Sequence, residues 1–411
     1  MRKNRFTKLL QTLYLTHINY GRNSLFESAA SCSFGFVFSF VPVMLMAVSL
    51  LSVVLDKYPD IMNYVLALCA NFSSVYDIKS LIVYFSQNGS VTFVNVVLSF
   101  FVIWVARTFF LSIARSISRI FHNQTPQKAY VIQLMTFIGE FTLILGLIAI
   151  VIVSFVLNQL ISQPAFDFLR EVFPFFFELG LNRISNLLFY LIIFIFTWSV
   201  YRFEPRTSPK MGVCFVFAVL QTVSFFLISI WINKFMNLSN YNIIYGAISS
   251  VIILMLKVYF FFMSFLFFAQ CLFVWQYLDS LLFCEMYMLP PEDSRKIGDI
   301  IKRKLFINPS VLQDEQNTMF LKQGDIIFSN GDESDSVFFI KKGRIIEELE
   351  NDELIYDKGV FFGEKSAMMK RPRQGTASAD CDCEIIRISA ENFRSLLLQN
   401  PRASAHAMAK L

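Results

Sequence analysis

Residues 362–376 read FGEKSAMMKRPRQGT, a stretch that combines glycine, acidic and basic residues at a spacing suited to an anionic ligand. Gly363 lets the backbone come close to a ligand, because glycine has no Cβ and tolerates positive φ. The short helix expected from Glu364 to Met368 presents free N–H groups at its N-terminus. Arg373 offers paired donors for phosphate oxygens, and Glu364 can accept a hydrogen bond from a sugar hydroxyl. The pattern predicts a pocket for a sugar phosphate with one negative charge.

The residues around this stretch predict a small β-roll. From about Asn317 onward, short apolar runs are separated by glycines at positions 324, 331, 343 and 359, and glycines between such runs mark turns. Upstream, a charged stretch from Lys296 to Leu305 predicts a short helix. On spacing alone a second interpretation stays open, in which Glu364 and Arg373 form a surface ion pair and the glycines serve only as turns.

Residues 317–411 closely resemble a cyclic-nucleotide-binding domain, because the segment from Phe362 to Ala379 aligns with the phosphate-binding cassette of that family without a gap. The resemblance implies an eight-stranded roll with Glu364 on the ribose 2′-hydroxyl and Arg373 on the cyclic phosphate of cAMP or cGMP. It also implies that further cradle contacts come from the backbone near the following residues: Gly363, Lys365, Ser366 and Gln374.

Three departures from this family leave the choice of nucleotide open. Lys365 stands where the family carries leucine, and Gln374 stands where it carries a small residue or threonine that helps to choose between purines. The sequence ends at Leu411, so we expect a short lid helix over the base. A lid supplied by a neighbouring subunit, in a homo-oligomer, is compatible with this pattern.

The rest of the chain is apolar enough to lie in a membrane. Of the 411 residues, 55% are hydrophobic and 16% charged, with a mean hydropathy of +0.54, whereas soluble domains have about 25% charged residues. A membrane-spanning helix needs roughly 20 apolar residues. Six segments meet this criterion: 29–55, 91–113, 131–157, 184–201, 211–235 and 244–275. We expect the moderately apolar segment 61–85 to be a helix outside the membrane or on its surface, and a seventh span there stays open. The amphipathic segment 161–181 is expected at the membrane surface.

Positive charge predicts the direction of these spans. Twelve lysines and arginines lie in segments 2–22, 107–128 and 202–210, whereas five lie in the loops on the other side. Because Lys and Arg are enriched in cytoplasmic loops, both termini are expected in the cytoplasm. The fold class predicted is therefore a six-span, multi-pass α-helical membrane bundle followed by a cytoplasmic β-roll.

Polar residues inside the spans are candidates for function. Glu140 and Lys257 fall in the middle third of the predicted bilayer, where isolated charges are costly. They predict an intramembrane charge pair or a shared wet cavity, and a purely structural pair, or Lys257 extending along its stem to the interface, stays open. Four amides predict interhelical hydrogen bonds: Asn95, Asn186, Gln221 and Gln270.

Residues 15–280 resemble the YihY/BrkB family of bacterial inner-membrane proteins, once labelled ribonuclease BN. The resemblance rests on four stretches: Ser39–Pro42, Trp104–Arg107, Tyr201–Pro205 and Tyr245–Ile248. It implies a six-span helical bundle in the bacterial inner membrane, with a transporter-like or lipid-related role. Lys257 departs from the apolar or aromatic residue that such proteins carry.

These observations predict three parts: a membrane domain at 1–280, a cytoplasmic helical linker at 281–316 and a cyclic-nucleotide-binding-like domain at 317–411. The function predicted is transporter-like, for lipid or a small solute, under regulation by cyclic nucleotide. A cyclic-nucleotide-gated channel and a non-transporting scaffold are the alternatives. We expect no enzyme and no metal site, because the chain has only 3 histidines and Cys381 and Cys383 lack a second pair. The sequence has no basic run of the kind that predicts nucleic-acid binding, so we expect no nucleic-acid partner.

Overall fold

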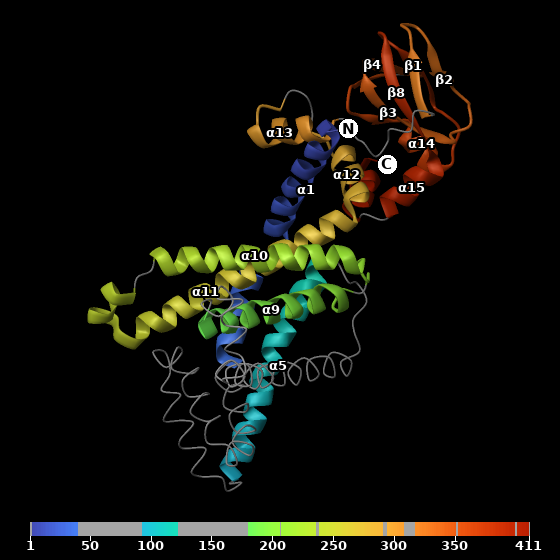
Figure 1. Ribbon diagram of the computed structural model, residues 1–411. Helices are drawn as coiled ribbons and strands as arrows, with labels where there is room; N and C mark the ends of the chain where they lie inside the picture. The colour runs from blue at the N-terminus through green and yellow to red at the C-terminus, as the bar shows by residue number, and fades with distance from the viewer. Residues whose placement is uncertain are drawn as a thin grey trace, which may run out of the picture. The chain divides into compact units, whose positions relative to one another are not determined.

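The computed structural model describes residues 2–39, 93–121, 180–205, 207–235, 238–290, 294–307, 317–350, 352–398 and 401–410. The chain divides into two compact units. Unit 1 consists of Met1–Thr16 and Val274–Leu411, and unit 2 of His17–Phe273. Figure 1 shows the helices and strands of both units.

Unit 2 is helical in every described segment. Its helices are the end of α1 (Arg2–Arg22), a helix at Leu25–Ser39, α5 (Phe93–Ile120), α9 (Gly180–Phe203), α10 (Met211–Phe235) and most of α11 (Leu238–Gln276). Two helical stretches are long and apolar enough to cross a membrane, Met211–Phe235 and Ile252–Gln276. The described helices overlap five of the predicted spans, whereas 131–157, like the surface segments 61–85 and 161–181, lies outside the described residues. The count of six and the direction of the spans stay predictions.

Polar side chains join the helices of unit 2 at two predicted positions. On α11, Ser264 donates a hydrogen bond to the Gln221 side chain of α10, with 2.9 Å between the oxygens. Asn23 donates to the Gln270 side chain over 3.1 Å. The predicted bonding of Gln221 and Gln270 is thus confirmed, and such bonds contribute about 0.6 kcal/mol each within a bilayer. The side chains of Asn95 and Asn186 lie outside the described part of the structure.

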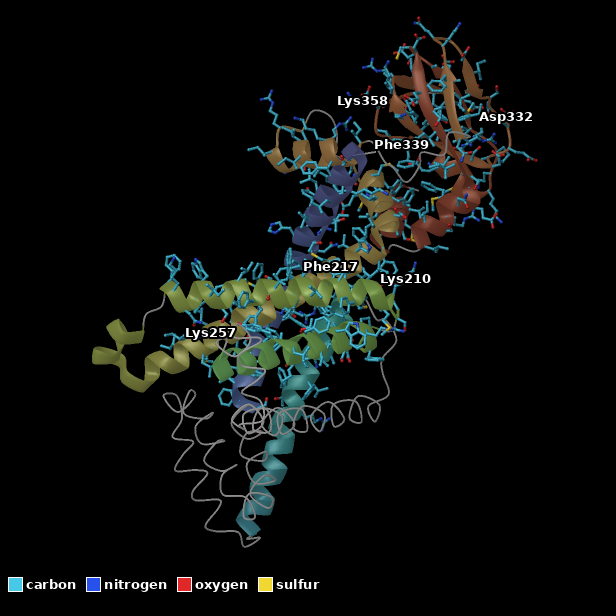
Figure 2. All side chains as sticks on the ribbon, in the orientation of Figure 1. Lys210, Phe217, Lys257, Asp332, Phe339 and Lys358 are labelled. Carbon is cyan, nitrogen blue, oxygen red and sulfur yellow. The ribbon has the colours of Figure 1, made fainter. Side chains whose placement is uncertain are left out.

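The predicted intramembrane pair is described only in part. Lys257 lies on α11 and is half-buried (Figure 2). Glu140 lies outside the described residues. The pairing of these two side chains therefore stays a prediction.

The C-terminal part of unit 1 is an antiparallel β-roll, as predicted. Its strands are β1 (Thr318–Leu321), β2 (Ile326–Phe328), β3 (Ser336–Lys342), β4 (Arg344–Leu349), β5 (Glu353–Asp357), β6 (Phe361–Phe362), β7 (Gly375–Ala379) and β8 (Cys383–Ser389). They form two four-stranded sheets, with strand orders β1-β8-β3-β6 and β2-β7-β4-β5. The four glycines predicted to make turns all have positive φ, which favours glycine over other residues.

Side chains of β3 alternate between two apolar cores, because successive residues of a strand point to opposite faces. Phe338 and Ile340 join the core between the two sheets, together with Phe362 of β6. Val337 and Phe339 lie in the other core, on the opposite face of the sheet, and Figure 2 labels Phe339. Helices cover this second core: α12 (Leu278–Tyr287), α14 (Glu364–Met369), α15 (Ala390–Leu398) and α16 (Pro401–Lys410).

Helix α12 is an integral part of this second core. Phe283 is 0% exposed, and its ring centroid lies 5.8 Å from that of Phe361 and 5.6 Å from that of Phe393. Tyr287 packs on the same two rings at 5.5 and 5.6 Å. The predicted boundaries at 280 and 317 stay predictions, but the core of the roll includes residues of the predicted linker.

Helix α13 (Ile297–Phe306) matches the predicted charged helix and is anchored by its basic residues. Lys302 pairs with Glu285 of α12 at 2.6 Å and donates to the Met288 carbonyl at 3.0 Å. Arg303 donates to the carbonyls of Pro290 and Lys358, at 2.9 and 2.8 Å. These contacts hold α13 against α12 and the roll.

The burial of Phe283 predicts a large loss of stability when the ring is removed. Phe283→Ala should lower the free energy of unfolding of the roll by about 3–5 kcal/mol, because the cavity is enclosed on all sides. Hydrogen exchange of β3 and β8 amides in the full-length protein measures this change. Phe320→Ala, at a ring that is 79% exposed, should change it by less than about 0.5 kcal/mol. Equal exchange rates in the two variants would show that α12 does not stabilise the roll.

Candidate functional site

The stretch 362–376 forms a strand, a turn, a short helix and a loop that leads into the next strand. Strand β6 ends at Phe362, and Gly363 has a φ of +72°. Helix α14 follows directly, as the sequence predicts, and Lys370 ends it with a φ of +52°. The loop then passes Arg373 and enters β7 at Gly375. This path brings Gly363 and Arg373, ten residues apart, into direct contact.

The guanidinium of Arg373 is buried, since the residue is only 3% exposed. Its Nη1 donates to the Gly363 carbonyl at 2.7 Å, and its Nη2 donates to the Ser336 carbonyl at 2.5 Å. The Cζ atom lies 4.3 Å from the ring centroid of Phe328, a distance suited to a cation–π contact. The open alternative, in which Arg373 belongs to a surface ion pair, is therefore wrong.

Backbone hydrogen bonds fix the loop that carries Arg373. The Arg373 N–H donates to the Asp332 carbonyl at 2.9 Å, and the Arg373 carbonyl accepts from Gly331 N–H at 2.9 Å. Asp332 lies in the turn between β2 and β3, where Figure 2 labels it. The position of the arginine is thus set by β2, β3 and β6 together.

Glycine is required at position 363 for two reasons. Its φ is positive, a region that costs other residues roughly 1–2 kcal/mol. A Cβ built there would lie 2.5 Å from Nη1 of Arg373. Gly363 therefore allows the backbone and the guanidinium to approach as closely as they do.

The electrostatics of the site keep Arg373 charged. Burial lowers the pKa of its guanidinium, because removal from water disfavours the charged form. The carboxylates of Glu347, Asp335 and Asp332 act in the opposite direction. The result is a buried cation within a group of acidic side chains.

Two of the three guanidinium nitrogens of Arg373, Nη1 and Nη2, donate to acceptors, and the third has none among the described residues. The Arg373 Nε is buried and has no hydrogen-bond partner among the described residues. Buried donors are almost always satisfied in folded proteins. An unsatisfied donor on a buried cation is therefore the feature here that fits an anionic ligand.

The other predicted site residues lie around Gly363 and Arg373. Glu364 is half-buried at the start of α14, and Ser366 is half-buried within it. Lys365 and Gln374 are exposed. The Ser366 carbonyl accepts the Arg371 N–H at 3.1 Å, which closes the loop after α14. The structure thus places all six residues in one segment, and their roles toward a ligand stay predictions.

Glu364 also links the site to α12 through electrostatics. Burial raises the pKa of the Tyr287 hydroxyl, and the Glu364 carboxylate raises it further. Tyr287 lies in the core beside Phe361, one residue before the end of β6. The first residue of α14 therefore lies close enough to the last residue of α12 for its charge to act on the Tyr287 hydroxyl.

Sequence reasoning missed Ser336, which holds Arg373 through its backbone carbonyl, and Phe328, which lies against the guanidinium. A backbone acceptor carries no side-chain signal. Phe328 reads in the sequence as an ordinary core residue of a strand. Among the described residues, no group of three or more His, Cys, Asp or Glu side chains could hold a metal ion.

Comparison with known protein families gives two matches. The model of the family described as virulence factor BrkB matches residues 16–280. The chain belongs to the BrkB family. The model of the cyclic nucleotide-binding domain matches residues 318–400, so this BrkB-family membrane protein carries such a domain at its C-terminal side. No curated protein matches the chain.

Solved structures that resemble the chain align with about a fifth of it. The catabolite activator protein of Thermus thermophilus is 25% identical, covering 23% of this chain and 46% of that chain, with a TM-score of 0.21. The global regulator CLP of Xanthomonas campestris is 21% identical, covering 22% and 50%, with a TM-score of 0.20. A protein from a cyclic-GMP-dependent bacterial signalling pathway is 23% identical, covering 23% and 78%, with a TM-score of 0.21. The chain thus spans at most half of the first two proteins.

The contact between Gly363 and Arg373 can be tested by adding one methyl group. Gly363→Ala should destabilise the loop that carries Arg373, because it adds a clash with Nη1 to the cost of a positive φ. Gly324→Ala is the matched control, since Gly324 has a φ of +88° and a Cβ there meets nothing within 4 Å. Hydrogen exchange of residues 363–376 should accelerate more in the first variant. Equal acceleration would mean that backbone strain alone accounts for the effect.

Proposed function

We propose that this BrkB-family protein is transporter-like, for lipid or a small solute, and that cyclic nucleotide bound in its C-terminal domain regulates the membrane domain. The observation that carries the proposal is the buried Arg373 guanidinium, whose Nη1 contacts Gly363 and whose Nε lacks an acceptor among the described residues. The match of residues 318–400 to the cyclic nucleotide-binding domain supports it.

The proposed ligand contacts follow the predicted roles. Arg373 binds the cyclic phosphate, and Glu364 accepts a hydrogen bond from the ribose 2′-hydroxyl. Backbone groups near the remaining site residues complete the cradle: Gly363, Lys365, Ser366 and Gln374. A cyclic phosphate carries a single negative charge, which suits one buried arginine. Charge-assisted bonds of this kind are about twice as strong as neutral ones.

The bonds of Arg373 suggest how binding changes the domain. Both of its Nη atoms donate to backbone carbonyls, those of Gly363 and Ser336. Phosphate oxygens compete with these carbonyls for the same donors. Any loss of the bond to Gly363 loosens the start of α14, which follows the strand whose Phe361 packs on Tyr287 of α12.

Helix α12 then connects the site to the membrane domain along the chain. Only Tyr277 separates the end of α11 from the start of α12. Cyclic nucleotide can shift the membrane domain only by the difference between its affinities for two states. Phe283 and Tyr287 of α12 pack against Phe361 of the roll, so the position of α12 can differ between those two states.

The proposed arrangement has six spans in the bacterial inner membrane and both termini in the cytoplasm. It comprises the membrane domain at 1–280, the linker at 281–316 and the nucleotide-binding domain at 317–411. The positive-inside distribution supports this direction, and it gives the domain access to cytoplasmic nucleotide. Glu140 and Lys257 are proposed to form the intramembrane charge pair. A channel and a scaffold are the alternatives that flux measurements separate.

Arginine at position 373 should be essential for nucleotide binding. In isothermal titration of the full-length protein with cAMP and cGMP, Arg373→Lys should weaken binding by roughly ten- to a hundredfold, because lysine cannot reproduce the paired donors. Arg371→Lys makes the same chemical change at an exposed neighbour and should leave the affinity within about twofold. Absence of binding to both nucleotides in the unmodified protein would reject nucleotide regulation.

Lys257 tests the membrane part of the proposal. In proteoliposomes with a fluorescent phosphatidylethanolamine as the probe, cAMP or cGMP should change the rate of lipid transfer. Lys257→Leu should remove this change, since it leaves an intramembrane partner charge unpaired. Lys234→Leu, at an exposed lysine near the end of α10, is the matched control. Nucleotide-dependent conductance in planar bilayers without lipid transfer would instead indicate the channel.

A further inference from the structure

Helix α1 exposes apolar residues and buries polar ones in unit 1. Phe6, Leu9, Leu10 and Leu13 follow the spacing of one helix face and are all exposed, Phe6 to 64%. The opposite face is buried and includes three polar residues: Gln11, Thr12 and Thr16. A helix on the surface of a soluble protein shows the reverse orientation. We therefore expect the exposed apolar stripe of α1 to be covered by a binding partner.

Helix α13 repeats this orientation. Ile297 is 77% exposed, and Ile300 and Ile301 lie beside it on the exposed face. The basic residues Lys302 and Arg303 point the other way and are held by Glu285 and backbone carbonyls. The apolar side of α13 is thus exposed, while its charged side contacts α12 and the roll.

The C-terminal end of α13 contacts α1 in unit 1 (Figure 1). Gln11 of α1 donates to the Leu305 carbonyl of α13 at 2.7 Å, and the rings of Tyr14 and Phe306 lie 5.6 Å apart. We call the exposed apolar residues of both helices the apolar face: Phe6, Leu9, Leu10, Leu13, Ile297, Ile300 and Ile301. Contact between the helices fixes the two stripes within one unit.

Exposed positive charges accompany the apolar face. Lys8, Arg295, Lys296 and Lys304 are all exposed on or next to the two helices. The only acidic residue of α13 is Asp299, and its carboxylate already accepts the Ser294 hydroxyl at 2.5 Å. Among the described residues on or next to the two helices, the exposed charge is therefore positive.

We propose that the apolar face binds the surface of an anionic lipid bilayer. Amphipathic helices with basic flanks insert apolar side chains at the headgroup level, and the basic residues contact anionic headgroups. A second copy of the chain fits less well, because pairing of two such faces brings like charges together. Because the chain belongs to the BrkB family of membrane proteins, a bilayer is present next to the protein. The proposal does not depend on nucleotide binding.

Contact with lipid can be measured at single positions of the full-length protein. Leu9→Cys and Ile300→Cys report the two helices, and Ile355→Cys, at an exposed isoleucine of β5, is the matched control. The background replaces Cys69 and Cys381 by serine, because the other five cysteines are buried. Each variant carries a bimane label in nanodiscs with brominated lipid. The discs contain phosphatidylcholine alone or about one third phosphatidylglycerol.

We expect quenching at positions 9 and 300 that increases with phosphatidylglycerol, and no quenching at 355. Quenching at positions 9 and 300 that is no stronger than at 355 would overturn the proposal. This is also the result expected if the apolar face binds a second copy of the protein and not lipid. Equal quenching in neutral and anionic nanodiscs would also overturn it, because the charged surface is part of the assignment.

Charge reversal tests the basic residues separately. Adding Lys296→Glu and Lys304→Glu to the Ile300→Cys protein should lower lipid contact at least about tenfold, since each basic residue contributes measurably at an anionic surface. The control combines Lys322→Glu and Lys342→Glu, two exposed lysines of the roll, and makes the same change in net charge. Equal quenching in the two combinations would overturn the proposal even if the apolar residues contact lipid.

Discussion

The buried guanidinium of Arg373 makes the interactions on which the β-roll depends. A charged group is costly to remove from water unless hydrogen bonds and nearby charges compensate. Here the compensation comes from two backbone carbonyls, an aromatic ring and surrounding carboxylates. These partners belong to β2, β3, β4 and the end of β6, and the arginine itself precedes β7. One side chain thereby connects both sheets of the roll with the loop that enters α14.

The second apolar core extends this connection to residues that precede the roll in the chain. Phe361 contacts Phe283 and Tyr287, and the next residue but one is Gly363, whose carbonyl accepts from Arg373. The carbonyl that accepts from Arg373 therefore lies two residues beyond a ring that packs against α12. In the proposed function, this core is the link between the nucleotide site and α12, the helix that follows α11.

Much of this could be predicted from the sequence, where local rules decide. The turn glycines, the helix beginning at Glu364 and the charged helix predicted at Lys296–Leu305 follow from backbone preferences and spacing. Gln221 and Gln270 were predictable as hydrogen-bond partners, because a polar side chain inside an apolar helix needs an acceptor or donor. The contact of Arg373 with Ser336 was not predictable, since a carbonyl has no identity in the sequence. The burial of Phe283 was also hidden, because an aromatic residue just after a membrane helix fits lipid contact equally well.

The amphipathic pattern of α1 shows why orientation is harder to predict than periodicity. Its spacing gives two faces, but nothing local decides that Gln11 faces the protein and Leu9 faces outward. That choice follows from the Leu305 carbonyl on α13, which needs a donor at the position where Gln11 lies. The boundary of unit 1 falls inside α1, between Thr16 and His17, and inside α11, between Phe273 and Val274. Since a helix propagates cooperatively along its hydrogen bonds, unit 1 has two helical connections to the rest of the chain. The contacts between α1 and α13 make residues 2–16 of α1 part of unit 1. The packing of α12 against the roll does the same for the residues that follow α11.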